Sequence, residues 1–279
     1  MIPAEFDYVA PGTLDEALAA LSDGGEDAKV LAGGHSLLPL MKLRLAAPAL
    51  LVDLRRVEEL RGVSSEDGVL RFGSMTRHHE VATGNYGLAA AAAATIADQQ
   101  VRNMGTIGGT IAHGDPASDL PAILLAVDGS VSVRGRSGAR EIAAADFFED
   151  YLTTTLAEDE IVTSINMPKL SGYGYGYEKF NRRQEDWAMV AVGALVKKAA
   201  DGSCEDVRIG LTHMSSTPLR ATAAEEALRG QPLTADSIAA AAENAAEGTE
   251  PPSDLNASQD YKRHLARVLT KRALTAASQ

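Results

Sequence analysis

The chain has 279 residues and 45% of them are hydrophobic, which is sufficient for two or three compact units with cores. Its formal net charge of −12 argues against a nucleic acid or an anionic membrane as partner, because phosphate contacts require clustered Lys and Arg. Any bound diphosphate would therefore have to be held mainly by backbone N–H groups and a few well-placed cations.

The single cysteine, Cys204, excludes an internal disulfide framework. One cysteine also cannot hold an iron–sulfur cluster, which generally needs four protein ligands. The opening residues, 1–6, lack the basic and apolar regions of a signal peptide. No apolar run is long enough to span a bilayer, so the sequence predicts a cytoplasmic location.

The first glycine segment, residues 29–42, has the pattern of a strand, a turn and a helix. Val30–Ala32 predicts a short buried strand, and an apolar helix follows from Ser36, which suits the N-cap position, with Pro39 in its first turn. The glycines at 33–34 allow a tight turn that directs several backbone N–H groups into one concavity, beside a helix N-terminus. The segment therefore predicts an anion site, with an ordinary turn as the alternative.

Two further elements complete residues 1–56. Thr13 caps a predicted helix at 14–21, in which apolar residues recur at helical spacing. Residues 48–54 predict a buried strand. Such β–α–β alternation favours a small mixed or parallel sheet.

Residues 57–170 alternate between predicted strands, at 68–74, 130–134 and 160–168, and predicted helices, from Thr76 and at 88–97. The helix from Thr76 carries His78 and His79. Adjacent residues point to different helix faces, so the two histidines cannot readily ligate one metal ion, and we expect both to face solvent.

The second glycine segment, residues 101–119, again places paired glycines, Gly108 and Gly109, before a predicted helix that Ser118 caps. Two glycine turns ~70 residues apart suggest one extended ligand held from both sides, because the missing Cβ atoms permit close backbone approach. Neither segment has the spacing of a P-loop or of a Rossmann dinucleotide-binding turn.

Residues 171–177 alternate Gly and Tyr, which places three tyrosines on one face of an extended strand. The alternatives are an edge strand that closes over the core and an aromatic shelf near a planar ligand. Beyond it, residues 189–197 and 207–214 predict paired strands, and 218–229, 234–246 and 258–276 predict helices.

The motifs Ala-Gly-Gly-His-Ser-Leu-Leu-Pro at 32–39 and Thr-Ile-Gly-Gly-Thr at 106–110 resemble the FAD-binding medium subunit of molybdenum hydroxylases. This family includes the flavoproteins of carbon monoxide dehydrogenase and the flavin domain of xanthine dehydrogenase, and the resemblance covers essentially the whole chain. The resemblance implies an α+β fold with three units. FAD-binding subdomains at 1–56 and 57–170 form a module of the p-cresol methylhydroxylase type. A C-terminal α+β domain of the CO dehydrogenase flavoprotein type follows at 171–279.

The resemblance also assigns residues to FAD, with its diphosphate on the two glycine segments. Lys179 matches a lysine near the flavin, so Lys179→Met is expected to lower the flavin reduction potential or to loosen FAD. Asp119 matches an acidic residue after the second motif, with helix capping as the alternative. Thr110 stands where the family more often has Asn, which leaves its polar contact open. The implied set is Leu31, Ala32, Gly33, Gly34, His35, Ser36, Leu37, Leu38, Pro39, Thr106, Ile107, Gly108, Gly109, Thr110, Asp119, Val162 and Lys179.

The implied function is electron transfer without a catalytic residue or a metal site on this chain. A large partner subunit would carry the molybdenum cofactor and a small one the [2Fe–2S] clusters, in a doubled heterotrimer. FAD would pass electrons to NAD, a quinone, a cytochrome or oxygen. Two alternatives stay open: a self-sufficient FAD-dependent oxidase or dehydrogenase, and a non-catalytic nucleotide-binding assembly subunit. His35 and His113 lie close to the paired glycines. For each of them there are two interpretations: it lines the ligand, or it only fills the turn.

Overall fold

The computed structural model describes residues 2–279, and its N-terminal section is built on a parallel sheet. Strands β1 (Asp7–Val9), β3 (Leu50–Asp53) and β2 (Ala28–Leu31) are adjacent in that order, and both pairs are parallel. Helix α1 (Leu14–Gly24) packs on the sheet, and the Thr13 side chain accepts a hydrogen bond from the Glu16 N–H at its start. The predicted β–α–β unit is confirmed, and of the two predicted forms, mixed or parallel, the sheet has the parallel one.

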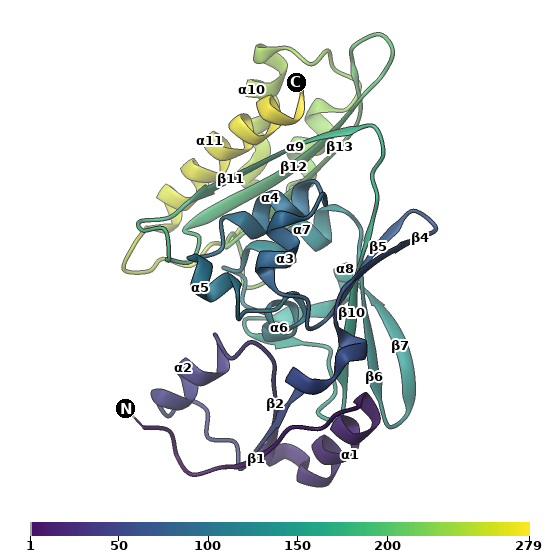
Figure 1. Ribbon diagram of the computed structural model, residues 1–279. Coiled ribbons are helices and arrows are strands. Elements are labelled where there is room, and N and C mark those ends of the chain that lie inside the picture. Colours follow the sequence, from purple (N-terminus) through teal and green to yellow (C-terminus); the bar gives the residue numbers. More distant parts are fainter. Residues whose placement is uncertain (1) are drawn as a thin grey trace.

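The middle section is a five-stranded antiparallel sheet with a group of short helices beside it (Figure 1). The strands, in spatial order, are β4 (Val63–Glu66), β5 (Val69–Gly73), β10 (Ile161–Pro168), β6 (Ser130–Gly135) and β7 (Gly138–Ala143). The helices are α3 (His78–Thr83), α4 (Leu88–Ala94), α5 (Gln99–Arg102), α6 (Ile107–His113), α7 (Asp119–Ala126) and α8 (Ala144–Phe147). Strands β8 (Phe148–Asp150) and β9 (Thr153–Thr154) form a separate pair.

The C-terminal section is a four-stranded antiparallel sheet with helices on both faces. Its strands, in order, are β11 (Tyr173–Phe180), β12 (Val190–Lys198), β13 (Cys204–Thr212) and β14 (Leu219–Arg220). Helix α11 (Gln259–Ala277) lies along one face, and α4 and α7 of the middle section lie on the other (Figure 1). Helices α9 (Thr222–Leu228) and α10 (Ala235–Glu243) pack with α11 on the same side. One apolar core therefore joins the middle section to the C-terminal sheet.

The tyrosine-bearing segment is the edge strand β11, and its glycines explain its orientation. A Cβ at Gly174 or Gly176 would lie 2.2 or 2.3 Å from a carbonyl oxygen of α11, so only glycine lets the helix approach this closely. The tyrosines consequently face the other way: Tyr173 and Tyr177 pack against the core of the middle section, and Tyr175 is 47% exposed. The edge-strand interpretation is confirmed, and the aromatic-shelf interpretation is wrong because none of the three lines the cavity described below.

The structure corrects two predictions in the middle section. The second glycine segment is not a turn, because Gly108 and Gly109 lie inside helix α6, whose N-cap is Thr106. His78 does not face solvent: it is 3% exposed and its Nε2 lies 3.0 Å from Thr110 Oγ1. Gly105 makes this burial possible, since a Cβ there would lie 2.7 Å from the His78 ring. Helix geometry predicted that the side chains of His78 and His79 lie on different helix faces. It did not predict which of these faces the rest of the protein would cover.

Across residues 2–279, no helix combines the length and the apolar character needed to cross a membrane.

Candidate cofactor site

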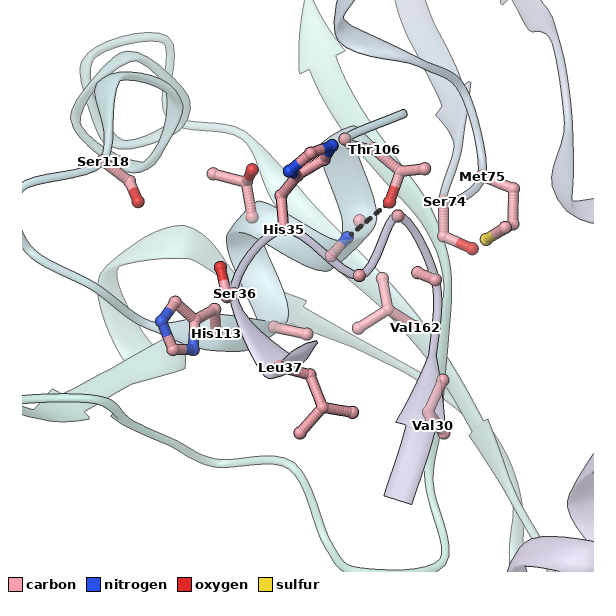
Figure 2. Close-up of a pocket in the computed structure, with 18 of the residues that line it drawn as sticks. Val30, His35, Ser36, Leu37, Ser74, Met75, Thr106, His113, Ser118 and Val162 are labelled. Carbon is pink, nitrogen blue, oxygen red and sulfur yellow. Dashed lines mark hydrogen bonds between the residues drawn. The ribbon is translucent and has the colours of Figure 1, made fainter. Parts of the chain in front are cut away.

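A cavity of about 580 Å³ lies between the N-terminal and middle sections. Both glycine segments line it, and β10 contributes Val162 and Ile161 to its wall. Figure 2 shows His35, Ser36 and Leu37 of the first segment around the same space as Thr106, His113 and Ser118. The volume lies in the range of sites that enclose a cofactor-sized ligand.

The first glycine segment presents a row of free backbone donors to this cavity. The N–H groups of residues 33–37 have no hydrogen-bond acceptor within residues 2–279, although α2 (Leu37–Lys42) begins directly after them. Gly34 has a φ of +77°, the left-handed conformation that favours glycine and turns the row inward. The Ser36 side chain makes no capping bond, so the predicted cap is at the right position without the predicted contact. Unpaired N–H groups in a row are a binding site for anionic oxygen atoms.

The second segment contributes space rather than donors. The N–H groups of Gly108, Gly109 and Thr110 are bonded to Ser74 O, Thr106 Oγ1 and Thr106 O, so none is free for a diphosphate. A Cβ on Gly108 would lie 2.4 Å from Ser74 Cβ, so this glycine lets α6 pack against the chain after β5. The expectation that the diphosphate lies on both segments stays a prediction: the first segment has free N–H donors for it, and the second lets the cavity walls approach closely.

Two serine hydroxyls at the cavity lack partners. Ser74 Oγ and Ser118 Oγ are buried without a hydrogen-bond partner within residues 2–279, and both residues line the cavity. Burying an unsatisfied hydroxyl costs about 1–3 kcal/mol. Such groups on a cavity wall fit a polar ligand that supplies the missing partners, as the ribityl and phosphate oxygens of FAD would. The sequence marked Ser118 only as a cap and did not mark Ser74.

Lys179 and Asp119 line the cavity as a buried ion pair. The Lys179 ammonium lies 2.9 Å from Asp119 Oδ2, and the two side chains are 5% and 4% exposed. The Tyr177 hydroxyl donates to Asp119 Oδ1 at 2.5 Å, and burial raises the pKa of this tyrosine well above its ordinary value. Asp119 makes no capping bond in α7; it ties β11 to that helix instead. The predicted cation is therefore present at the cavity, but its charge is compensated.

A second carboxylate in the wall is also compensated, which limits repulsion of an anionic ligand. Glu160 bonds Arg140 at 2.7 Å, and this guanidinium holds the pKa of the carboxyl below its usual value. Half-buried His113 lines the cavity too, and burial lowers its pKa. The buried carboxylates at this wall are thus paired, so they oppose an anionic ligand less than free carboxylates would.

All but four of the residues in the implied FAD-binding set line the cavity. Leu31 and Ile107 are buried in apolar cores next to it, while Leu38 and Pro39 lie exposed on α2. Sequence reasoning missed several lining residues because they lie outside the two glycine motifs at 32–39 and 106–110. The principal ones are Lys29, Ser74, Met75, His78, Ile96, Val101, Glu158, Glu185 and Trp187.

The fold and the cavity define a ligand-binding α+β module with backbone donors for an anionic cofactor. The family model of the FAD-binding domain in molybdopterin dehydrogenase matches residues 4–170. The model of the CO dehydrogenase flavoprotein C-terminal domain matches residues 175–277.

Relatives match over nearly the whole chain. The chain is 41% identical to the carbon monoxide dehydrogenase medium chain of Hydrogenophaga pseudoflava, over 99% of this chain and 98% of the relative. It is 36% identical to the 6-hydroxypseudooxynicotine dehydrogenase complex subunit alpha of Paenarthrobacter nicotinovorans, over 99% of this chain and 96% of the relative. A chain of the solved structure of reconstituted CO dehydrogenase from Oligotropha carboxidovorans matches with a TM-score of 0.96 and 37% identity. The match covers 100% of this chain and 99% of that chain.

The chain therefore belongs to the family of FAD-binding medium subunits of the carbon monoxide dehydrogenase and xanthine dehydrogenase type. It is an oxidoreductase flavoprotein subunit that contains an FAD-binding domain followed by a CO dehydrogenase flavoprotein C-terminal domain.

Proposed function

We propose that this chain is the FAD-binding electron-transfer subunit of a heteromeric molybdenum hydroxylase. It receives electrons from the [2Fe–2S] clusters of a small partner subunit and passes them to an external acceptor, while a large partner holds the molybdenum cofactor. FAD in the cavity supplies reversible electron storage between these partners. The FAD lies between units 1–56 and 57–170, and unit 171–279 completes the wall through Lys179.

The row of free N–H groups at residues 33–37 carries this proposal. It supplies donors for a diphosphate without the clustered cations that an acidic chain lacks. The partnerless hydroxyls of Ser74 and Ser118 extend the polar wall, and Val162 adds an apolar surface suited to the isoalloxazine ring. The residues present therefore fit FAD by their donors, their partnerless hydroxyls and their apolar wall.

Titration of the apo chain with FAD tests the cofactor. Trp187 is the only tryptophan, lines the cavity and is 53% exposed, so its fluorescence should fall in step with one equivalent of FAD. Riboflavin, which lacks the diphosphate, is the matched control and should bind much more weakly. An apo chain that shows neither flavin absorption after gel filtration nor Trp187 quenching would contradict the proposal.

The isolated chain with FAD is expected to show no substrate-dependent turnover. Its single cysteine cannot hold the clusters that would link FAD to a molybdenum site. Dye reduction would be measured with carbon monoxide, aldehydes and N-heterocycles, with NADH as a control for slow diaphorase-like transfer. Oxidation of an organic substrate by the chain alone at ~1 per second or faster would favour a self-sufficient flavin oxidase instead.

An apolar patch beside the cavity supports a partner subunit on this side. Helix α2 lines the cavity with Leu37 and Leu40, and the same stretch of chain exposes Leu38 (37%), Leu43 (58%) and Leu45 (74%). Clustered exposed apolar residues mark interaction surfaces. A helix is ~10 Å thick, so a chain docked here would place its electron donors close to FAD. We assign this α2 patch to the small iron–sulfur subunit.

Replacing both Leu43 and Leu45 by Glu is expected to abolish co-purification of the partner chains without loss of FAD. Two carboxylates in the patch would have to be desolvated in the interface, which is strongly unfavourable. Leu255→Glu is the matched control, because Leu255 is fully exposed on the loop before α11, outside this patch. Affinity purification from co-expressing cells would report the retained subunits, and an intact complex with the double variant would exclude this patch.

A further inference from the structure

His78 and Thr110 form a buried polar pair whose purpose the FAD assignment leaves open. His78 begins α3 and Thr110 lies in α6, and their Nε2 and Oγ1 atoms are 3.0 Å apart. Both residues line the cavity. The second ring nitrogen, Nδ1, is buried and has no hydrogen-bond partner within residues 2–279.

The surroundings of His78 keep its ring neutral. Burial is the largest cause that lowers the pKa of His78 to about 4, and the neighbouring His35 and Arg102 lower it further. A neutral imidazole carries one N–H and one lone pair. The question is therefore which nitrogen holds the hydrogen.

Hydrogen-bond satisfaction decides between the two tautomers. If Nδ1 carried the hydrogen, the only donor of the ring would be buried without an acceptor, and orphaned buried N–H groups are rarer than under-satisfied acceptors. If Nε2 carries it, the donor bonds Thr110 Oγ1 and only a lone pair is left at Nδ1. The Nε2–H tautomer is therefore favoured.

The tautomer determines what Thr110 can do. A hydroxyl that accepts from His78 keeps its own hydrogen for another acceptor, and the structure records no second partner for Thr110 Oγ1 within the described chain. Since Thr110 lines the cavity, that hydrogen is available to a ligand there. We propose that His78 is a positioning residue that holds Thr110 as a hydrogen-bond donor toward an acceptor atom of the bound cofactor. This inference rests on the proposed FAD-binding function.

The tautomer is measurable on the apo chain, independently of FAD. Nitrogen-15 NMR of the histidine rings, with the His78→Gln spectrum used to assign the signals, should show His78 as the Nε2–H form at neutral pH. A protonated Nδ1 at His78 would overturn the proposal, because Thr110 would then be the donor to the ring.

FAD titrations test whether His78 acts through Thr110. His78→Leu and Thr110→Val should each weaken FAD binding about tenfold, and the double variant should be no weaker than either, which is the signature of coupled residues. His78→Gln, whose amide can donate to Thr110, should restore most of the affinity. In the Thr110→Asn variant, the asparagine amide supplies its own N–H donor. Adding His78→Leu to that variant should therefore leave the FAD affinity unchanged.

Additive losses in the double variant would show that His78 acts only through packing and would overturn the proposal. Thermal unfolding of each apo variant shows that the compared proteins are folded. If the wild-type chain itself binds no FAD, the proposed function fails, while the NMR result still reports the tautomer. The two failures are thus distinguishable.

Discussion

Lys179→Met is expected to lower the free energy of unfolding of the apo chain by about 3–5 kcal/mol. Removing one member of a buried ion pair leaves the other charge uncompensated. Asp119 is 4% exposed, and its remaining contact is the Tyr177 hydroxyl, which cannot neutralise it. Urea unfolding at neutral pH measures the effect.

Arg183→Met is the matched control, because Arg183 is exposed, and its effect should stay within ~0.5 kcal/mol. The variant that combines Lys179→Met with Asp119→Asn should recover much of the lost stability, since no charge is then left buried. If Lys179→Met were as harmless as Arg183→Met, the ion pair would not be formed in solution.

The pairing also revises what Lys179 does for the flavin. An isolated cation beside the ring would raise the reduction potential, but Asp119 lies 2.9 Å from the ammonium and cancels most of its field at the cavity. We therefore expect Lys179→Met to act mainly on stability and FAD retention, with a smaller shift of the potential than the sequence suggested. Spectroelectrochemical titration of the reconstituted variant separates these effects.

Gly109→Val is expected to give a folded chain whose FAD affinity falls about a hundredfold or more, equivalent to ~2.8 kcal/mol. A Cβ at Gly109 would lie 3.5 Å from Ala32 Cβ, so the valine methyl groups would occupy the cavity between the two glycine segments. The same Cβ lies 2.9 Å from Thr106 Oγ1, so a loss of ~1 kcal/mol from the disturbed cap is expected as well.

Thermal unfolding with and without FAD measures both effects. Ligand at a hundred times its Kd stabilises a protein by ~2.7 kcal/mol. FAD should therefore raise the unfolding temperature of the wild type strongly and that of Gly109→Val hardly at all. Gly12→Val is the control, since a Cβ there meets no atom closer than 3.7 Å. Full flavin occupancy in Gly109→Val would place the cofactor elsewhere.

Gly33→Val does not offer the same test, although Gly33 is also one of the paired motif glycines. A Cβ at Gly33 would lie 2.4 Å from the Met104 carbonyl oxygen, so the two glycine segments touch each other there through their backbones. Overpacking of this kind typically costs 1–3 kcal/mol or more. This variant is therefore expected to lose stability together with FAD, which would hide the cause.

Features that depend on local patterning were predictable from the sequence. The alternation of strand and helix signals predicted the parallel N-terminal sheet, and helical spacing predicted α11 within a residue at each end. The paired glycines before an apolar run predicted the turn at residues 33–34 and its free N–H groups. Each of these needs only neighbours in the chain, because backbone dihedrals and side-chain periodicity are local properties.

What each side chain meets across the fold was decided by tertiary packing. Lys179 forms an ion pair with Asp119, which lies 60 positions away in the sequence. His78 is buried only because Gly105 leaves room for its ring. Gly108 lines the cavity, and its missing Cβ also lets α6 pack against Ser74. Charge compensation, burial and the fate of a backbone N–H depend on atoms that distant segments bring together. The motifs therefore located the cofactor site, and the tertiary structure determined which groups remain free to bind.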